Sequence, residues 1–184
     1  MPDDGPPDLP MSLWPRVGVV PGARECLIAL HGRLPLCIAT NAAQSSRTMI
    51  ETALDRVDLL PLVSRVFCFT EIGFKKSRPE FWHAVTQQLQ VPLGQVVMVG
   101  DSLEGDVLAP RRFGLQTVWF NQQGRRPPPA EAVPTVTDLE QFAELVVKLV
   151  LHRCDGSVPR SPLHISPVAK LLRIARHLRV RYCR

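Results

Sequence analysis

Polar and charged residues come shortly after each of three short apolar runs of the sequence. Thr40 and Asn41 follow the run LCIA, a lysine pair follows RVFCFTEIGF, and Asp101 and Asp106 follow VVMVG. A hydroxyl, an amide and an ammonium group suit the oxygens of a phosphoryl group. Two carboxylates five residues apart suit a Mg²⁺ ion that keeps water ligands and bridges to phosphate. These residue types together indicate a phosphate-binding site.

The segments before these polar groups have the composition of buried strands, because they are short and almost wholly apolar. Strands are expected at 35–40, 66–70, 96–101 and 116–120. Apolar residues at helical spacing predict helices at 23–33, 44–59, 79–89, 104–113 and 138–151. This alternation predicts an α/β fold, with a parallel sheet covered by helices on both faces. Ligands of such sheets bind at the carboxyl ends of the strands, which brings the polar groups to one edge.

The 184 residues have a formal net charge of +5, and that charge is unevenly distributed. Residues 1–150 have a net charge of −2, whereas residues 151–184 have a net charge of +7. The basic character therefore belongs to the C-terminal end and does not indicate nucleic-acid binding by the main body.

Composition divides the chain into four parts. Residues 1–15 are rich in Pro and Asp and are expected to be extended or disordered, and 16–151 form the core domain. Residues 152–166 resemble a linker, and 167–184 have the spacing of a basic amphipathic helix. This tail could contact nucleic acid or an anionic membrane. We favour the simpler alternatives, a solvated helix packed on the body or an unselected extension.

The five cysteines are scattered without a CxxC pair, which argues against a disulfide framework and a zinc site. Cys37 and Cys68 lie within apolar runs and are expected to be small core residues of a reducing compartment. The N-terminus does not resemble a signal peptide, and no apolar run reaches the roughly 18–20 residues of a membrane span. We therefore expect a cytoplasmic protein. The five histidines form no cluster, and Phe81 and Trp82 are expected in the core.

Several motifs, in this order, resemble the haloacid dehalogenase-like (HAD) hydrolase superfamily, in the subgroup with a small helical cap. They are Pro21-Gly22 before a helix, LCIATN, GFKKSRPEFW and VVMVGDSLEGD, of which GDSLEGD is the most specific. The resemblance covers about residues 18–148. It implies a Rossmann-type three-layer sandwich with a mostly parallel sheet. It also implies a phosphatase-like hydrolase that cleaves phosphomonoesters through an aspartyl-phosphate.

The resemblance assigns roles to individual residues. Thr40 matches the phosphate-binding residue of the family, and Asn41 matches the neighbour that helps to orient the substrate. Lys76 matches the lysine that neutralises the charge of nucleophile and phosphate. It directly precedes Ser77-Arg78-Pro79, where the family usually has Pro-Asp-Pro. Lys75 is the alternative.

The acid pair also has family roles. Asp101 matches the residue that ligates Mg²⁺, and Asp106 matches the residue that supports the ion, often through water. For both acids, and for Thr40 and Asn41, the alternative interpretation is an ordinary role at a helix N-terminus. For Lys76, the alternative is a solvated lysine of a loop. The implied partner is a small phosphorylated metabolite, whose identity the sequence does not reveal.

The nucleophile of the family is not found in this sequence. Members begin with an apolar strand that ends in Asp-x-Asp, but Asp3-Asp4 follow only Met-Pro, and Asp8 has no partner. The cap is missing too, and Arg16–Val20 match the connector that follows the cap rather than the first strand. That strand is expected at the centre of the sheet, between those ending in Thr40 and Asp101. Its absence predicts unpaired strand edges and self-association, and it predicts a chain that is inactive alone.

Two other functions remain open. The first is a non-catalytic HAD-like binding or scaffold protein that uses its basic tail for interactions. The second is haloacid dehalogenase-type hydrolysis of a carbon–halogen bond. The combination of Lys76 with an acid pair favours phosphate over halide, because the dehalogenases need no metal.

Overall fold

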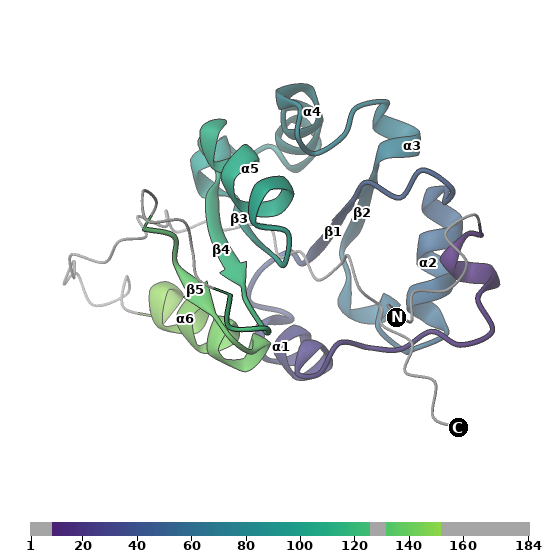
Figure 1. Cartoon of the computed structure of the whole chain (residues 1–184), viewed down its shortest axis with the longest axis horizontal. Coiled ribbons are helices and arrows are strands. Elements are labelled where there is room, and N and C mark those ends of the chain that lie inside the picture. Colours follow the sequence, from purple (N-terminus) through teal and green to yellow (C-terminus); the bar gives the residue numbers. More distant parts are fainter. Residues whose placement is uncertain (1–8, 126–131, 152–184) are drawn as a thin grey trace.

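The computed structural model describes residues 9–125 and 132–151 (Figure 1). The helices are α1 (Ala23–Leu30), α2 (Arg47–Asp55), α3 (Phe69–Ile72), α4 (Pro79–Leu89), α5 (Ala109–Arg112) and α6 (Leu139–Leu151). The strands are β1 (Cys37–Thr40), β2 (Arg65–Cys68), β3 (Val97–Gly100), β4 (Gln116–Phe120) and β5 (Thr135–Val136). Short 3₁₀ helices lie at Met11–Leu13, Leu60–Leu62 and Leu93–Gln95, and a π-helical turn lies at Leu103–Leu108.

All described strand pairs are parallel, as the sequence predicts, but they form two sheets. β1 pairs with β2, with Thr40 opposite Cys68, and the second sheet has the order β3-β4-β5. Within the described ranges, β1 and β3 therefore each have a strand neighbour on one side only. This arrangement agrees with the α/β fold and the parallel pairing expected from the sequence.

Two apolar clusters join the sheets into one core. One contains Ile38 of β1, Val97 of β3 and side chains of α1, α2 and α6. The other contains Cys37 of β1, Met98 of β3 and side chains of α4. Neighbouring residues of a strand point to opposite faces, so α4 covers one face while α1, α2 and α6 cover the other. Figure 1 shows α4 and α1 on opposite sides of the strands.

The predicted helices and strands are found, with local differences. The strand expected at 66–70 ends at Cys68, because Phe69 and Thr70 already belong to α3, which closes at Gly73 in the left-handed conformation. The helix expected at 104–113 is divided into the π-helical turn and α5. β5 was not predicted, because two residues are too few to show a period.

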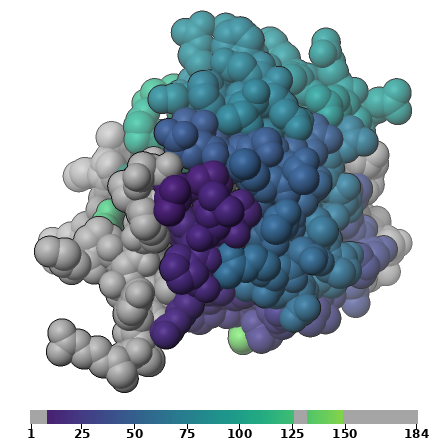
Figure 2. All heavy atoms as spheres, turned by 90° about the vertical axis from the view of Figure 1, so that its right-hand side faces the viewer, coloured from purple at the N-terminus to yellow at the C-terminus, as the bar shows by residue number. Residues whose placement is uncertain are grey.

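Part of the predicted extended lead-in is instead folded against α2. Met11–Leu13 form a 3₁₀ helix, and the Arg56 guanidinium donates hydrogen bonds to the carbonyl oxygens of Ser12, Trp14 and Pro15. Figure 2 shows this N-terminal segment lying on the surface of the following elements. Residues 1–8, the predicted linker 152–166 and the predicted tail helix 167–184 lie outside the described residues.

Other expectations are met within the described ranges. Cys37 and Cys68 are buried at 1% and 0% exposure, and Phe81 and Trp82 are fully buried. Arg16–Val20 form no strand, and Val19 and Val20 pack against the core as a connector to α1. None of the helices that the structure describes is long and apolar enough to cross a membrane.

Candidate functional site

A buried ion pair lies at the centre of the predicted site. The Lys76 Nζ atom lies 2.7 Å from Asp106 Oδ1, and both side chains are at most 2% exposed. Burial raises the pKa of the Asp106 carboxyl group above its usual value, because desolvation penalises the carboxylate, while the positive charge of Lys76 acts in the opposite direction. The fold thus brings together two charged groups that lie 30 residues apart.

Asn41 connects this ion pair to the end of β1. Its Oδ1 atom accepts a hydrogen bond of 2.8 Å from the backbone N–H of Lys76. Thr40 is 6% exposed, and its Oγ1 atom accepts a hydrogen bond of 3.1 Å from the N–H of Ala42. The N-cap of α2 is Ser46, which accepts from the N–H of Met49. Thr40 therefore does not have the helix-cap role considered for it.

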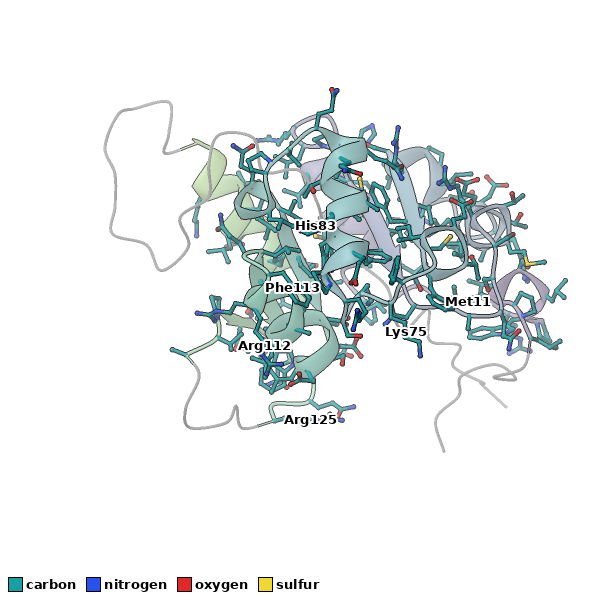
Figure 3. All side chains as sticks on the ribbon, turned by 90° about the horizontal axis from the view of Figure 1, so that it is seen from above. Met11, Lys75, His83, Arg112, Phe113 and Arg125 are labelled. Atoms are coloured by element: carbon teal, nitrogen blue, oxygen red, sulfur yellow. The ribbon has the colours of Figure 1, made fainter. Side chains whose placement is uncertain are left out.

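The structure distinguishes the two lysines of the KK pair. Lys76 is 1% exposed and is directed into the site, whereas Lys75 is exposed on the surface. Lys75 Nζ lies 6.0 Å from the centre of the Phe69 ring. Figure 3 shows Lys75 at the margin of the molecule. Of the two, only Lys76 therefore lies beside an acid of the predicted site.

The turn after β3 brings the two acids close together. The Ser102 N–H donates to Asp106 Oδ2 at 3.3 Å, and the Asp106 N–H donates to the carbonyl oxygen of Ser102 at 2.8 Å. The negative charge of Asp101 contributes to the raised pKa of Asp106, as expected for neighbouring carboxylates. Gly100 is needed here, because a Cβ atom at this position would lie 2.5 Å from the Asp106 side chain.

These donors fit a magnesium ion by their chemistry. Mg²⁺ is usually bound by one or two carboxylates together with waters and substrate phosphate, and Asp101 with Asp106 provides such a pair. Asp106 also binds Lys76 and Ser102, which favours Asp101 as the direct ligand and Asp106 as its support. Within the described ranges, no group of three or more His, Cys, Asp and Glu residues could hold a metal by itself.

Three residues at the site were not identified from the sequence. Trp82 donates a hydrogen bond to the carbonyl oxygen of Lys76, and Trp119 donates one to that of Asp101. Gly100 allows the close approach of Asp106. The glycine could have been noticed within the GDSLEGD motif. No pattern in the sequence indicates which carbonyl oxygens accept hydrogen bonds from the two indole groups.

A model of the haloacid dehalogenase-like hydrolase family matches residues 13–114, which is more than half of the chain. The chain belongs to the haloacid dehalogenase-like hydrolases. The resemblance inferred from the motifs is thereby confirmed. The HAD relatives include the pyrimidine 5′-nucleotidase YjjG of Escherichia coli (strain K12), which is 29% identical over 131 residues. The match covers 70% of this chain and 57% of YjjG, so the chain spans little more than half the length of that relative.

Solved HAD structures agree with the fold. A HAD phosphatase from Thermococcus onnurineus has a TM-score of 0.60 and 26% identity, covering 70% of this chain and 58% of that one. The magnesium-bound HAD-hydrolase YfnB of Bacillus subtilis has a TM-score of 0.62 and 23% identity, covering 69% and 55%. The structural likeness to YfnB concerns the fold alone.

Proposed function

We propose that this chain provides the phosphate- and magnesium-binding part of a phosphomonoester hydrolase site. The observation that supports this most directly is the buried pair of Lys76 and Asp106, with a distance of 2.7 Å between Nζ and Oδ1. A buried lysine is costly unless it is paired. Its placement beside an acid pair at a strand end is therefore difficult to explain as a surface feature.

Each residue has a role in this proposal. The Lys76 ammonium group neutralises negative charge on the phosphoryl group, and the Thr40 hydroxyl can donate a hydrogen bond to a phosphoryl oxygen. Asn41 holds the backbone of Lys76 and thereby contributes to the site through that lysine. Asp101, supported by Asp106, would hold Mg²⁺, which polarises a phosphoryl oxygen as a Lewis acid.

The substrate class we propose is a small phosphorylated metabolite. Support comes from the relatives, which include the pyrimidine 5′-nucleotidase YjjG and the phosphatase from T. onnurineus. The acid pair and the buried lysine suit phosphate oxygens and a hard cation.

Binding of inorganic phosphate tests the proposal, with the neighbouring lysine as the matched control. In the presence of Mg²⁺, we expect Lys76→Met to weaken phosphate binding by about tenfold or more, since a charge-assisted contact is lost. Lys75→Met should leave the affinity within about twofold, because exposed charges are strongly screened. Isothermal titration calorimetry measures both. Equal effects of the two substitutions would contradict the proposed site.

We further propose that the 184-residue chain does not turn over phosphomonoesters alone, because its sequence contains no recognisable Asp-x-Asp strand. The measurement is hydrolysis of p-nitrophenyl phosphate with and without Mg²⁺. Magnesium-dependent turnover that is abolished by Asp101→Ala would overturn this expectation, and it would require a different nucleophile.

A further inference from the structure

Two tryptophan side chains donate hydrogen bonds to the backbone of two site residues. The Trp82 Nε1 atom lies 2.7 Å from the carbonyl oxygen of Lys76, and the Trp119 Nε1 atom lies 3.1 Å from that of Asp101. The third tryptophan, Trp14, donates to the carbonyl oxygen of Leu9. The two buried indoles therefore have acceptors on the two separate loops that form the site.

Trp82 fixes the loop before α4. Its side chain is fully buried, packs edge-to-face against Phe81 with ring centres 5.2 Å apart, and belongs to the core cluster that also contains residues of β1 and β3. The backbone N–H of Lys76 is bound by Asn41, and its carbonyl oxygen is bound by Trp82. Both peptide groups of this lysine are thus held, one by the residue that follows β1 and the other from α4.

Trp119 fixes the turn after β3. It lies beside Gly100 in the parallel register of β3 and β4, and it is 3% exposed. Its ring packs with Val107 and Leu108, which directly follow Asp106, while its Nε1 atom binds the Asp101 carbonyl oxygen. One side chain therefore contacts both ends of the turn that contains the two acids.

We propose that Trp82 and Trp119 are positioning residues. Trp82 holds the backbone that directs Lys76 toward Asp106, and Trp119 holds the backbone that presents the acid pair. Phenylalanine would fill most of the same space but has no N–H donor, which would leave a carbonyl oxygen without its present partner. The assignment of phosphate and Mg²⁺ as ligands rests on the proposed function, whereas the effect on each loop can be measured without ligand.

The first experiment needs no ligand. Amide hydrogen exchange is followed by NMR in Trp82→Phe, in Trp119→Phe and in the control Trp14→Phe. We expect Trp82→Phe to accelerate exchange at Lys76 and to weaken the NMR signal of its ammonium group, which persists only while the ion pair is protected from solvent. Trp119→Phe should instead accelerate exchange at Ser102 and Asp106. Acceleration spread evenly over the core would indicate a general loss of stability and overturn the inference.

The second experiment compares affinities for inorganic phosphate and for Mg²⁺ in the same folded proteins. We expect Trp82→Phe to weaken phosphate binding about tenfold and Trp119→Phe to weaken Mg²⁺ binding about tenfold. Losses of this size are typical when a group that orients a direct metal ligand is removed. Each variant should affect the other ligand less than its own. Trp14→Phe should affect neither, because its indole binds the carbonyl oxygen of Leu9, which belongs to neither of the two site loops.

The outcomes separate the two proposals. If the unmodified chain binds neither phosphate nor Mg²⁺, the proposed function fails, and the exchange pattern still decides whether each indole holds its own loop. If the unmodified chain binds both ligands, but the two variants bind them unchanged or weakened to the same extent, the proposed function stands and the positioning roles are wrong.

Discussion

Lys76 is a charged side chain with 1% exposure, and its burial is explained by its partners. The Asp106 carboxylate provides the opposite charge, and Asn41 and Trp82 bind the adjacent peptide groups. Removing water from an ammonium group costs several kcal/mol, which a well-placed carboxylate offsets only in part. The lysine therefore indicates a binding or catalytic role better than it indicates a contribution to stability.

Asp106→Asn should destabilise the fold by about 3–5 kcal/mol, because it leaves the Lys76 charge buried without a carboxylate. The double substitution Lys76→Met with Asp106→Leu should restore most of this loss, since no charge then remains buried. The measurement is the free energy of unfolding in urea. The matched control is Glu104→Gln, which breaks an exposed ion pair with Arg112 and should cost less than about 1 kcal/mol. An Asp106→Asn variant with the same free energy of unfolding as the unmodified chain would contradict the predicted cost of leaving Lys76 buried without a carboxylate.

The junction of β3 with the following π-helical turn determines where the acids lie. The turn folds back so that Asp106 contacts both Ser102 and the end of β3, and Gly100 provides the necessary space. The missing side chain at Gly100 matters because of this contact and not because of its backbone conformation, since its φ is not positive.

Gly100→Ala should destabilise the protein by about 1–3 kcal/mol, because an added Cβ would lie 2.5 Å from Asp106 and force it to move. Gly94→Ala is the matched control, since the nearest atom to its added Cβ is 3.9 Å away. We expect Gly94→Ala to have little effect. Thermal unfolding of both variants is the measurement, and equal shifts in Tm would contradict the close contact.

At the scale of the whole molecule, two sheets share one core between layers of helices. The cysteines of this core are deeply buried, and burial raises the pKa of both the Cys26 and the Cys37 thiols to about 12. An unfolded chain loses these protons near pH 9, whereas the folded chain retains them. The free energy of unfolding should therefore depend on pH in the alkaline range, because these buried thiols are deprotonated more easily in the unfolded chain.

The free energy of unfolding should fall as the pH rises above 9, because the unfolded state binds fewer protons than the folded state. Each of the two thiols contributes a slope of about 1.4 kcal/mol per pH unit between 9 and 12. Cys37→Ala should make this slope shallower by that amount. Urea unfolding between pH 8 and 10.5, in the presence of a reductant, tests this. An unchanged slope would show that the thiol does not titrate as expected.

Much of the arrangement was predictable because the signals are local. The apolar spacing of residues 79–89 gave the bounds of α4, and the apolar runs located four of the strands. The polar groups that follow the strands predicted a site with Thr40, Asn41, a lysine of the pair, Asp101 and Asp106, and the family resemblance favoured Lys76 over Lys75. The limits of β2 were not predictable, since Phe69 continues the apolar run while its backbone already turns into α3.

The sequence by itself determined the alternation of strands and helices, the family, and the residue types at one sheet edge, because each depends on neighbours along the chain. Only the tertiary structure decided that Lys76 rather than Lys75 meets Asp106, and that Trp82 and Trp119 bind the backbone of the site. These contacts join residues from different elements, such as Trp119 with Asp101 across 18 positions. Hydrogen bonds of this kind depend on how the elements pack and on the direction of each side chain, and the periodicity of residues along the chain does not predict either.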